Sequence, residues 1–168
     1  MPRAPFQVLV IPFRRTPEGI RYALFKRHLI EMVDLKLDGT GNAPLEQLNA
    51  GFWQPVAGGG EDNETPEEAA RREAFEEAGI HGDLRLIRLD TVSSIPVVHF
   101  PDRDHWGPEI HVIPEYSFGI EVENEEISLC DEHTEYQWLN YSDAYARVRF
   151  DSNRTALWEL NRRLEIRS

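Results

Sequence analysis

The stretch Gly58–Ile80, GGGEDNETPEEAARREAFEEAGI, decides the fold expected for this chain. It joins a run of three glycines to a segment rich in glutamate. Thr65 and Glu68 form a capping box with Pro66 at the first helical position, and Gly79 is placed to end a helix in the left-handed conformation. We therefore predict a helix from Pro66 to Ala78.

One side of this predicted helix is acidic. Glu73, Glu76 and Glu77 fall within an arc of about a quarter of the helix circumference, at about 100° of rotation per residue. Like charges at these spacings repel one another. Such a cluster is either a solvated face or a site where a cation gathers the carboxylates, and hard oxygen ligands suit magnesium or manganese.

The spacing of the fixed residues in this stretch carries further information. Five residues separate Gly58 from Glu64 and seven separate Glu64 from Arg72, after which Glu73, Glu76, Glu77 and Gly79 follow at set intervals. This pattern resembles the signature of the Nudix hydrolase family at every fixed position. The resemblance implies an α/β/α sandwich with a mixed central sheet and a loop–helix–loop catalytic motif.

The resemblance also implies a chemistry. Nudix enzymes use water and divalent cations, usually Mg²⁺ or Mn²⁺, to cleave a phosphoanhydride bond in a nucleoside diphosphate linked to another group. It implies Glu76 and Glu77 as the principal metal ligands, and Glu73 as a further ligand or as the base that activates water. A pyrophosphate is anionic, so it approaches such an acidic cluster only when metal ions lie between them.

The remaining motif residues receive supporting roles from the same resemblance. Arg72 would orient the carboxylates, and Glu64 would support the loop. A backbone carbonyl near Ala57 or Gly58 would complete the metal coordination. Glycines such as Gly59 let the backbone come close to metal and phosphate.

A second acidic cluster spans residues 131–135. Glu132 and His133, followed by Tyr136 and Trp138-Leu139, are similar to a stretch of bacterial dihydroneopterin triphosphate pyrophosphatases. That similarity makes Glu132 a candidate fourth carboxylate, as metal ligand or general base. The alternative is a solvated loop.

Three residues outside the motif are candidates for substrate binding. Lys26 and Arg27 lie where a predicted strand ends and are placed either to contact phosphate oxygens or to form a solvated rim. Trp53 is placed either to stack on a pterin or nucleobase or to pack in the core.

Strands are predicted around the motif from alternating and apolar runs. The predicted strands span residues 6–13, 20–26, 52–56, 84–93, 112–122 and 136–139, and two closing helices span residues 142–148 and 153–164. Pro12 predicts an edge position or a bulge for the first strand. Residues 28–50 form an unusually long connection, which is expected to be functional or mobile.

Composition bounds the class of protein. The 168 residues fit a single domain, 1–168, and carry 18 basic against 30 acidic side chains, a net charge of −12. This balance argues against binding a nucleic acid polymer or an anionic membrane, and favours a small phosphorylated substrate that arrives with metal. A single cysteine, Cys130, excludes an internal disulfide, and we expect a cytoplasmic protein. The sequence does not determine the oligomeric state.

Together these features predict a magnesium-dependent pyrophosphohydrolase acting on dihydroneopterin triphosphate or a nucleoside triphosphate. One alternative is hydrolysis of ADP-ribose or a nucleotide sugar. Another is a catalytically silent Nudix-fold domain that senses a nucleotide. The complete set of Arg72, Glu73, Glu76 and Glu77 favours catalysis.

Overall fold

The computed structural model describes residues 3–27, 51–131 and 133–166. The long connection 28–50 and Glu132 lie outside these residues. Within the described residues, no helix is both long enough and apolar enough to cross a membrane.

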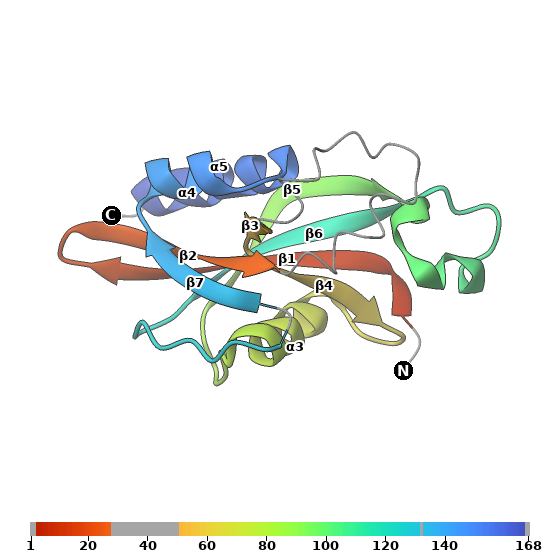
Figure 1. The fold of residues 1–168 in the computed structure, drawn as a ribbon, viewed down its shortest axis with the longest axis horizontal. Helices are drawn as coiled ribbons and strands as arrows, with labels where there is room; N and C mark the ends of the chain where they lie inside the picture. The colour runs from red at the N-terminus through yellow and green to blue at the C-terminus, as the bar shows by residue number, and fades with distance from the viewer. Residues whose placement is uncertain (1–2, 28–50, 132, 167–168) are drawn as a thin grey trace.

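A twisted mixed sheet forms the middle of the molecule (Figure 1). Its strands are β1 (Arg3–Thr16), β2 (Gly19–Arg27), β3 (Phe52–Gln54), β4 (Val56–Glu61), β5 (Leu86–Pro96), β6 (Val112–Glu121) and β7 (His133–Leu139). The order is β3-β2-β1-β6-β5, with β4 beside β1 and β7 beside β2. β1 and β6 are parallel, and the other pairs are antiparallel.

Helices cover both faces of the sheet. α3 (Pro66–Ala78) packs against one face, and α4 (Tyr141–Arg147) and α5 (Asp151–Ile166) pack against the other (Figure 1). Two short 3₁₀ turns, η2 (Val97–His99) and η3 (Pro101–His105), follow β5. This arrangement confirms the expected α/β/α sandwich.

Each face has its own apolar core. On the α3 side, Ala70, Ala74 and Ala78 belong to one buried cluster with strand residues such as Val8 and Phe25, and their small size lets the helix lie close to the sheet. On the α5 side, Leu157, Leu160 and Leu164 pack against another set of strand residues. Alternation along β1 divides its side chains between the two cores.

The predicted helix α3 has the expected ends. Both halves of the capping box between Thr65 and Glu68 form, and Gly79 is left-handed with φ 68°. The helix ends therefore agree with the prediction from local sequence.

The glycine run differs from the predicted loop. Gly58, Gly59 and Gly60 lie in β4, where Gly58 pairs with Val8 and Gly59 with Gln7. Side chains occupy the space where Cβ atoms would project: Glu73 at Gly58, Arg3 at Gly59 and Phe6 at Gly60. The glycines are thus required by close packing on both faces of a strand, and the irregular link to α3 is shorter than expected.

The edge position predicted for the first strand is wrong, because β1 lies inside the sheet. One side of β1 pairs with β6 throughout residues 7–13. On its other side the partner changes from β4, up to Val10, to β2, from Phe13. Pro12 lies in this interval, so among the described strands it interrupts neither antiparallel pairing.

Candidate active site

Arg72 lies at the centre of the acidic motif. Its guanidinium donates to Glu64 (Nε–Oε2 2.7 Å, Nη2–Oε1 2.9 Å), to Glu73 Oε1 at 2.9 Å and to Glu76 Oε2 at 3.1 Å. It also donates to the carbonyl oxygen of Gly59 at 2.9 Å. One side chain thus ties the end of β4 to three carboxylates of the motif.

Glu64 supports this arrangement from the turn before α3. Its Oε1 accepts from the Glu61 amide at 2.8 Å as well as from Arg72. The hydrogen bond from Arg72 is the main cause that lowers the pKa of Glu64. Glu64 therefore remains an ionised anchor for Arg72.

Two of the helix carboxylates are buried at the sheet. Glu73 is 9% exposed and Glu77 is 3% exposed, whereas the side chain of Glu76 is 53% exposed. Burial raises the pKa of Glu73, while hydrogen bonds with Glu77 and Arg72 oppose the rise. Holding these carboxylates together is costly for the isolated protein, and a bound cation would remove that cost.

Arg27 and His133 contact Glu77 from the sheet side. Arg27 Nη2 lies 3.0 Å from Glu77 Oε1 and 2.9 Å from the carbonyl oxygen of Ala57. His133 Nε2 lies 3.4 Å from the same Glu77 oxygen, and its Nδ1 lies 3.5 Å from Cys130 Sγ. The Glu77 carboxylate is therefore fixed by β2 and β7 as well as by its own helix.

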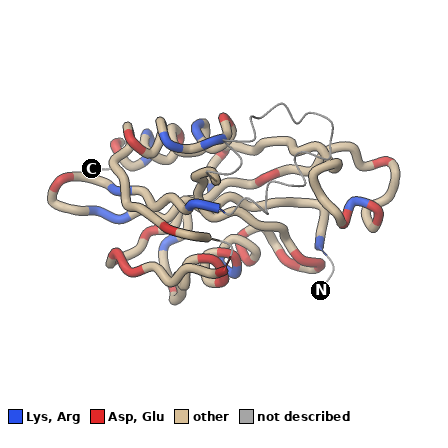
Figure 2. The backbone as a smooth tube through the Cα atoms, in the orientation of Figure 1, with Lys and Arg blue, Asp and Glu red and all other residues tan. Residues whose placement is uncertain are grey.

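A cavity opens over these carboxylates. It is lined by the acidic residues Glu73, Glu76, Glu77 and Asp131, together with Arg3, Arg27, Ala57, Gly58 and Cys130. Acidic positions also gather along α3 and the adjoining turn (Figure 2).

The side chains of this cavity fit a hard divalent cation in donor type and charge. Within the described residues, however, no group of three or more His, Cys, Asp or Glu side chains is arranged as a ready metal site. Instead, Arg72 and Arg27 balance the carboxylates. The carbonyl oxygen of Ala57, predicted as a possible metal ligand, accepts a hydrogen bond from Arg27 Nη2 at 2.9 Å.

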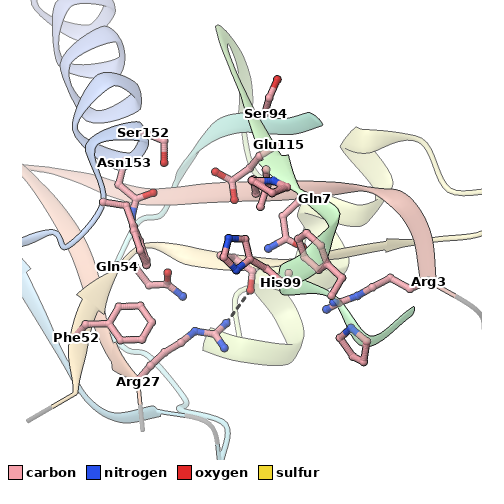
Figure 3. Close-up of a pocket in the computed structure, with 17 residues that line it drawn as sticks. Arg3, Gln7, Arg27, Phe52, Gln54, Ser94, His99, Glu115, Ser152 and Asn153 are labelled. Carbon is pink, nitrogen blue, oxygen red and sulfur yellow. Dashed lines mark hydrogen bonds between the residues drawn. The ribbon is translucent and has the colours of Figure 1, made fainter. Parts of the chain in front are cut away.

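A second, larger cavity of about 480 Å³ adjoins the first on the side of the sheet that α5 covers (Figure 3). Four residues line both cavities: Arg3, Arg27, Ala57 and Gly58. Other walls come from β6, from the η2 region and from the start of α5. This volume suits a small organic ligand.

The other substrate-binding candidates take different positions. Trp53 packs against the α5-side core, with the Arg147 guanidinium 5.3 Å from its ring centroid. Lys26 pairs with Trp53 and Glu135 in the sheet, and neither Lys26 nor Trp53 lines the two cavities as far as the structure describes them. Gly59 supplies its carbonyl to Arg72, and Glu132 lies outside the described residues.

Several residues of the site were not predicted from sequence. Arg3, Glu115 and Asn153 line the larger cavity, and none of them was predicted to belong to the site. Glu115 has a detectable signal, since it falls in phase with the buried residues Ile113 and Ser117 of β6. An acidic residue at an inward position of a strand is uncommon and indicates a function.

Comparison with known proteins gives the family. The profile of the NUDIX domain matches residues 43–159, more than half of the chain. The protein belongs to the Nudix family. This Nudix chain is 32% identical over 108 residues to the dihydroneopterin triphosphate diphosphatase of Haemophilus influenzae, covering 63% of this chain and 68% of that protein.

The chain is also similar to a second enzyme and to a solved structure. A 60-residue stretch is 47% identical to the 8-oxo-dGTP diphosphatase of Proteus vulgaris, covering 36% of this chain and 49% of that one. A crystal structure of a candidate NUDIX hydrolase from Listeria monocytogenes superposes with a TM-score of 0.76 at 37% identity, covering 98% of this chain and 97% of that one. The chain is accordingly a Nudix pyrophosphohydrolase.

Proposed function

We propose that this Nudix hydrolase is magnesium-dependent and cleaves the triphosphate of a pterin or a nucleoside, with dihydroneopterin triphosphate as the favoured substrate. The named activity of the Haemophilus influenzae relative supports this choice. The acidic cavity supports metal dependence, since a triphosphate is repelled by Glu73, Glu76 and Glu77 unless cations lie between them.

The residues take the following proposed roles. Glu73, Glu76 and Glu77, with a carbonyl of Ala57 or Gly58, hold Mg²⁺, which Mn²⁺ can replace. When bound, the ion lowers the pKa of a water molecule and neutralises phosphate charge. Arg72 orients Glu73 and Glu76 through its hydrogen bonds.

A carboxylate must also accept a proton from the attacking water. Glu73 and Glu132 are the two candidates for this base. Glu73 lies in the acidic cavity, where burial raises its pKa and so makes its carboxylate a better proton acceptor. The variants Glu73→Gln and Glu132→Gln distinguish the two candidates. Only the variant that lacks the base is expected to lose the acidic limb of the pH–rate profile.

The observation that carries the proposal is the connection between the two cavities. Because Arg3 and Arg27 line both, a ligand whose ring occupies the larger cavity places its phosphates between two guanidinium groups and next to the acidic helix. Guanidinium groups bind phosphate oxygens well. The scissile bond then lies over Glu73 and Glu77.

A substrate panel tests this proposal. The protein is incubated with equal Mg²⁺ and with dihydroneopterin triphosphate, the common and oxidised nucleoside triphosphates, or ADP-ribose, and kcat/KM is measured from pyrophosphate or phosphate release. We expect the highest value for dihydroneopterin triphosphate and no turnover in EDTA. Highest activity on ADP-ribose would instead support the nucleotide-sugar alternative.

The same panel tests the alternative of a silent sensor. Tight binding of a nucleotide without turnover, under conditions where a known Nudix hydrolase is active, would reject catalysis. Where the acidic cavity is altered by Glu77→Gln, the matched control is Glu67→Gln. Glu67 also lies on α3, but it pairs with Arg88 outside the acidic cavity.

A further inference from the structure

The larger cavity contains a buried acidic group that the proposed chemistry does not use. Glu115 lies on β6, where it pairs with Gln7 of β1 and Ser93 of β5. It is 6% exposed, and within the described residues its carboxyl forms no ion pair or side-chain hydrogen bond. Burial alone raises its pKa to about 7.

Buried polar groups from two other elements face the same cavity. Asn153, in the first turn of α5, is 2% exposed, and its Nδ2 has no hydrogen-bond partner among the described residues. The Oε1 of Gln7 is likewise buried and without a partner there. Figure 3 shows the side chains of Glu115 and Asn153 directed into the cavity from opposite sides.

An unsatisfied buried donor or acceptor is costly, and several around one cavity indicate a ligand that satisfies them. The cavity supplies carboxyl and amide acceptors from Glu115 and Gln7, and one amide donor from Asn153. Its matching ligand presents adjacent N–H donors and a carbonyl acceptor. The rings of Phe52 and Phe150, with centroids 5.5 Å apart, provide an apolar wall for a planar ring.

We propose that the larger cavity is a specificity site for the 2-amino-4-oxopyrimidine edge shared by pterins and guanines. The Glu115 carboxyl accepts from the ring N–H and the 2-amino group, a two-point contact, and Asn153 Nδ2 donates to the 4-oxo group. Adenine presents an amino group beside an unprotonated ring nitrogen and lacks this pattern. The proposal rests on the proposed function in placing the phosphates at the acidic cavity.

The direct test compares ligands that differ only at this edge. Inosine triphosphate lacks the 2-amino group of GTP, so the ratio of their kcat/KM values measures that contact. We expect the wild-type protein to favour GTP over inosine triphosphate by about tenfold or more, since each lost buried hydrogen bond costs about that factor. ATP is expected to be poorer than GTP.

Glu115→Gln replaces one acceptor oxygen by an N–H₂ donor at nearly constant volume. We expect it to bring the ratio of GTP to inosine triphosphate close to one and to lower kcat/KM for dihydroneopterin triphosphate by a similar factor. Asn153→Ala is expected to weaken GTP and inosine triphosphate equally, because both retain the oxo group. Glu121→Gln is the matched control on β6, since Glu121 pairs with Arg15 and Arg85 outside the cavity.

Binding of neopterin and guanosine, which carry no phosphate, separates this inference from the hydrolase proposal. If no triphosphate is cleaved but neopterin binds the wild type and binds Glu115→Gln at least about tenfold more weakly, the site stands and the proposed hydrolysis fails. An unchanged ratio of GTP to inosine triphosphate in folded Glu115→Gln would overturn the specificity site, as would equal losses on GTP, inosine triphosphate and ATP.

Discussion

Arg72 and Glu64 form a two-point ion pair, with Nε–Oε2 at 2.7 Å and Nη2–Oε1 at 2.9 Å. The remaining donor, Nη1, contacts Glu73 and Glu76. The planar guanidinium thus holds the carboxylates of the helix in a fixed position relative to the turn before α3. A point-like ammonium group does not make this set of contacts.

Arg72→Lys is therefore expected to reduce kcat by about 10- to 100-fold, because the carboxylates lose their common anchor. Steady-state kinetics with saturating Mg²⁺ measure the change. Arg71→Lys is the control, since Arg71 lies on the same helix and its guanidinium donates to the carbonyl oxygen of Leu84 rather than to a carboxylate of the motif. Equal activity of Arg72→Lys and Arg71→Lys would contradict an orienting role for Arg72.

The parts of the site that were predicted from sequence depend on local signals. The limits of α3 follow from Thr65, Glu68 and Gly79, which act within one or two turns of their own position. The cluster of Glu73, Glu76 and Glu77 follows from the helical period. Both are properties of a continuous stretch of chain.

The parts that were missed depend on contacts between distant segments. The glycine run is a strand because β1 pairs with it, which no local rule predicts. Glu115 and Asn153, 38 positions apart in the sequence (153 − 115), line one cavity because α5 packs against the face of the sheet from which Glu115 of β6 projects. Likewise, the pattern of histidines gave no reason to place His133 beside Glu77.

His133 is expected to support the acidic site through Glu77. Its side chain is fully buried, with its ring 5.4 Å from that of Phe25 and Nε2 3.4 Å from Glu77 Oε1. His133→Phe keeps an aromatic ring and removes the nitrogen atoms, so we expect Mn²⁺ affinity to fall by about tenfold. Calorimetric titration measures the affinity. His81→Phe is the control, because His81 is exposed and follows α3. Wild-type Mn²⁺ affinity in His133→Phe would contradict a supporting role for His133.

Stability should depend on pH through Glu115. Its pKa is raised from 4.5 to about 7 in the folded protein, so below pH 4.5 both states hold the proton and the shift has no effect. Between pH 4.5 and pH 7 the unfolded chain releases the Glu115 proton while the folded protein keeps it, so the free energy of unfolding falls as pH rises. The full loss of stability is reached above pH 7. Since one pKa unit corresponds to about 1.4 kcal/mol, the cost reaches up to about 3 kcal/mol.

Glu115→Gln cannot titrate and should remove this cost. Its free energy of unfolding relative to wild type is expected to increase between pH 4.5 and pH 8, as measured by urea denaturation at both values. Glu121→Gln should show no comparable increase. A constant difference between Glu115→Gln and wild type across this pH range would mean that the carboxyl titrates normally. Greater stability together with weaker substrate selection would show that the buried acid serves binding at the expense of folding.

The most direct measurement of the central claim is Mn²⁺ binding and turnover by Glu77→Gln beside Glu67→Gln. Glu77 is 3% exposed in the acidic cavity, whereas Glu67 lies outside it on the same helix. We predict that folded Glu77→Gln loses at least about 100-fold in both Mn²⁺ affinity and kcat/KM, while Glu67→Gln retains wild-type values. Wild-type Mn²⁺ affinity and turnover in Glu77→Gln would contradict the assignment of the metal to this cavity.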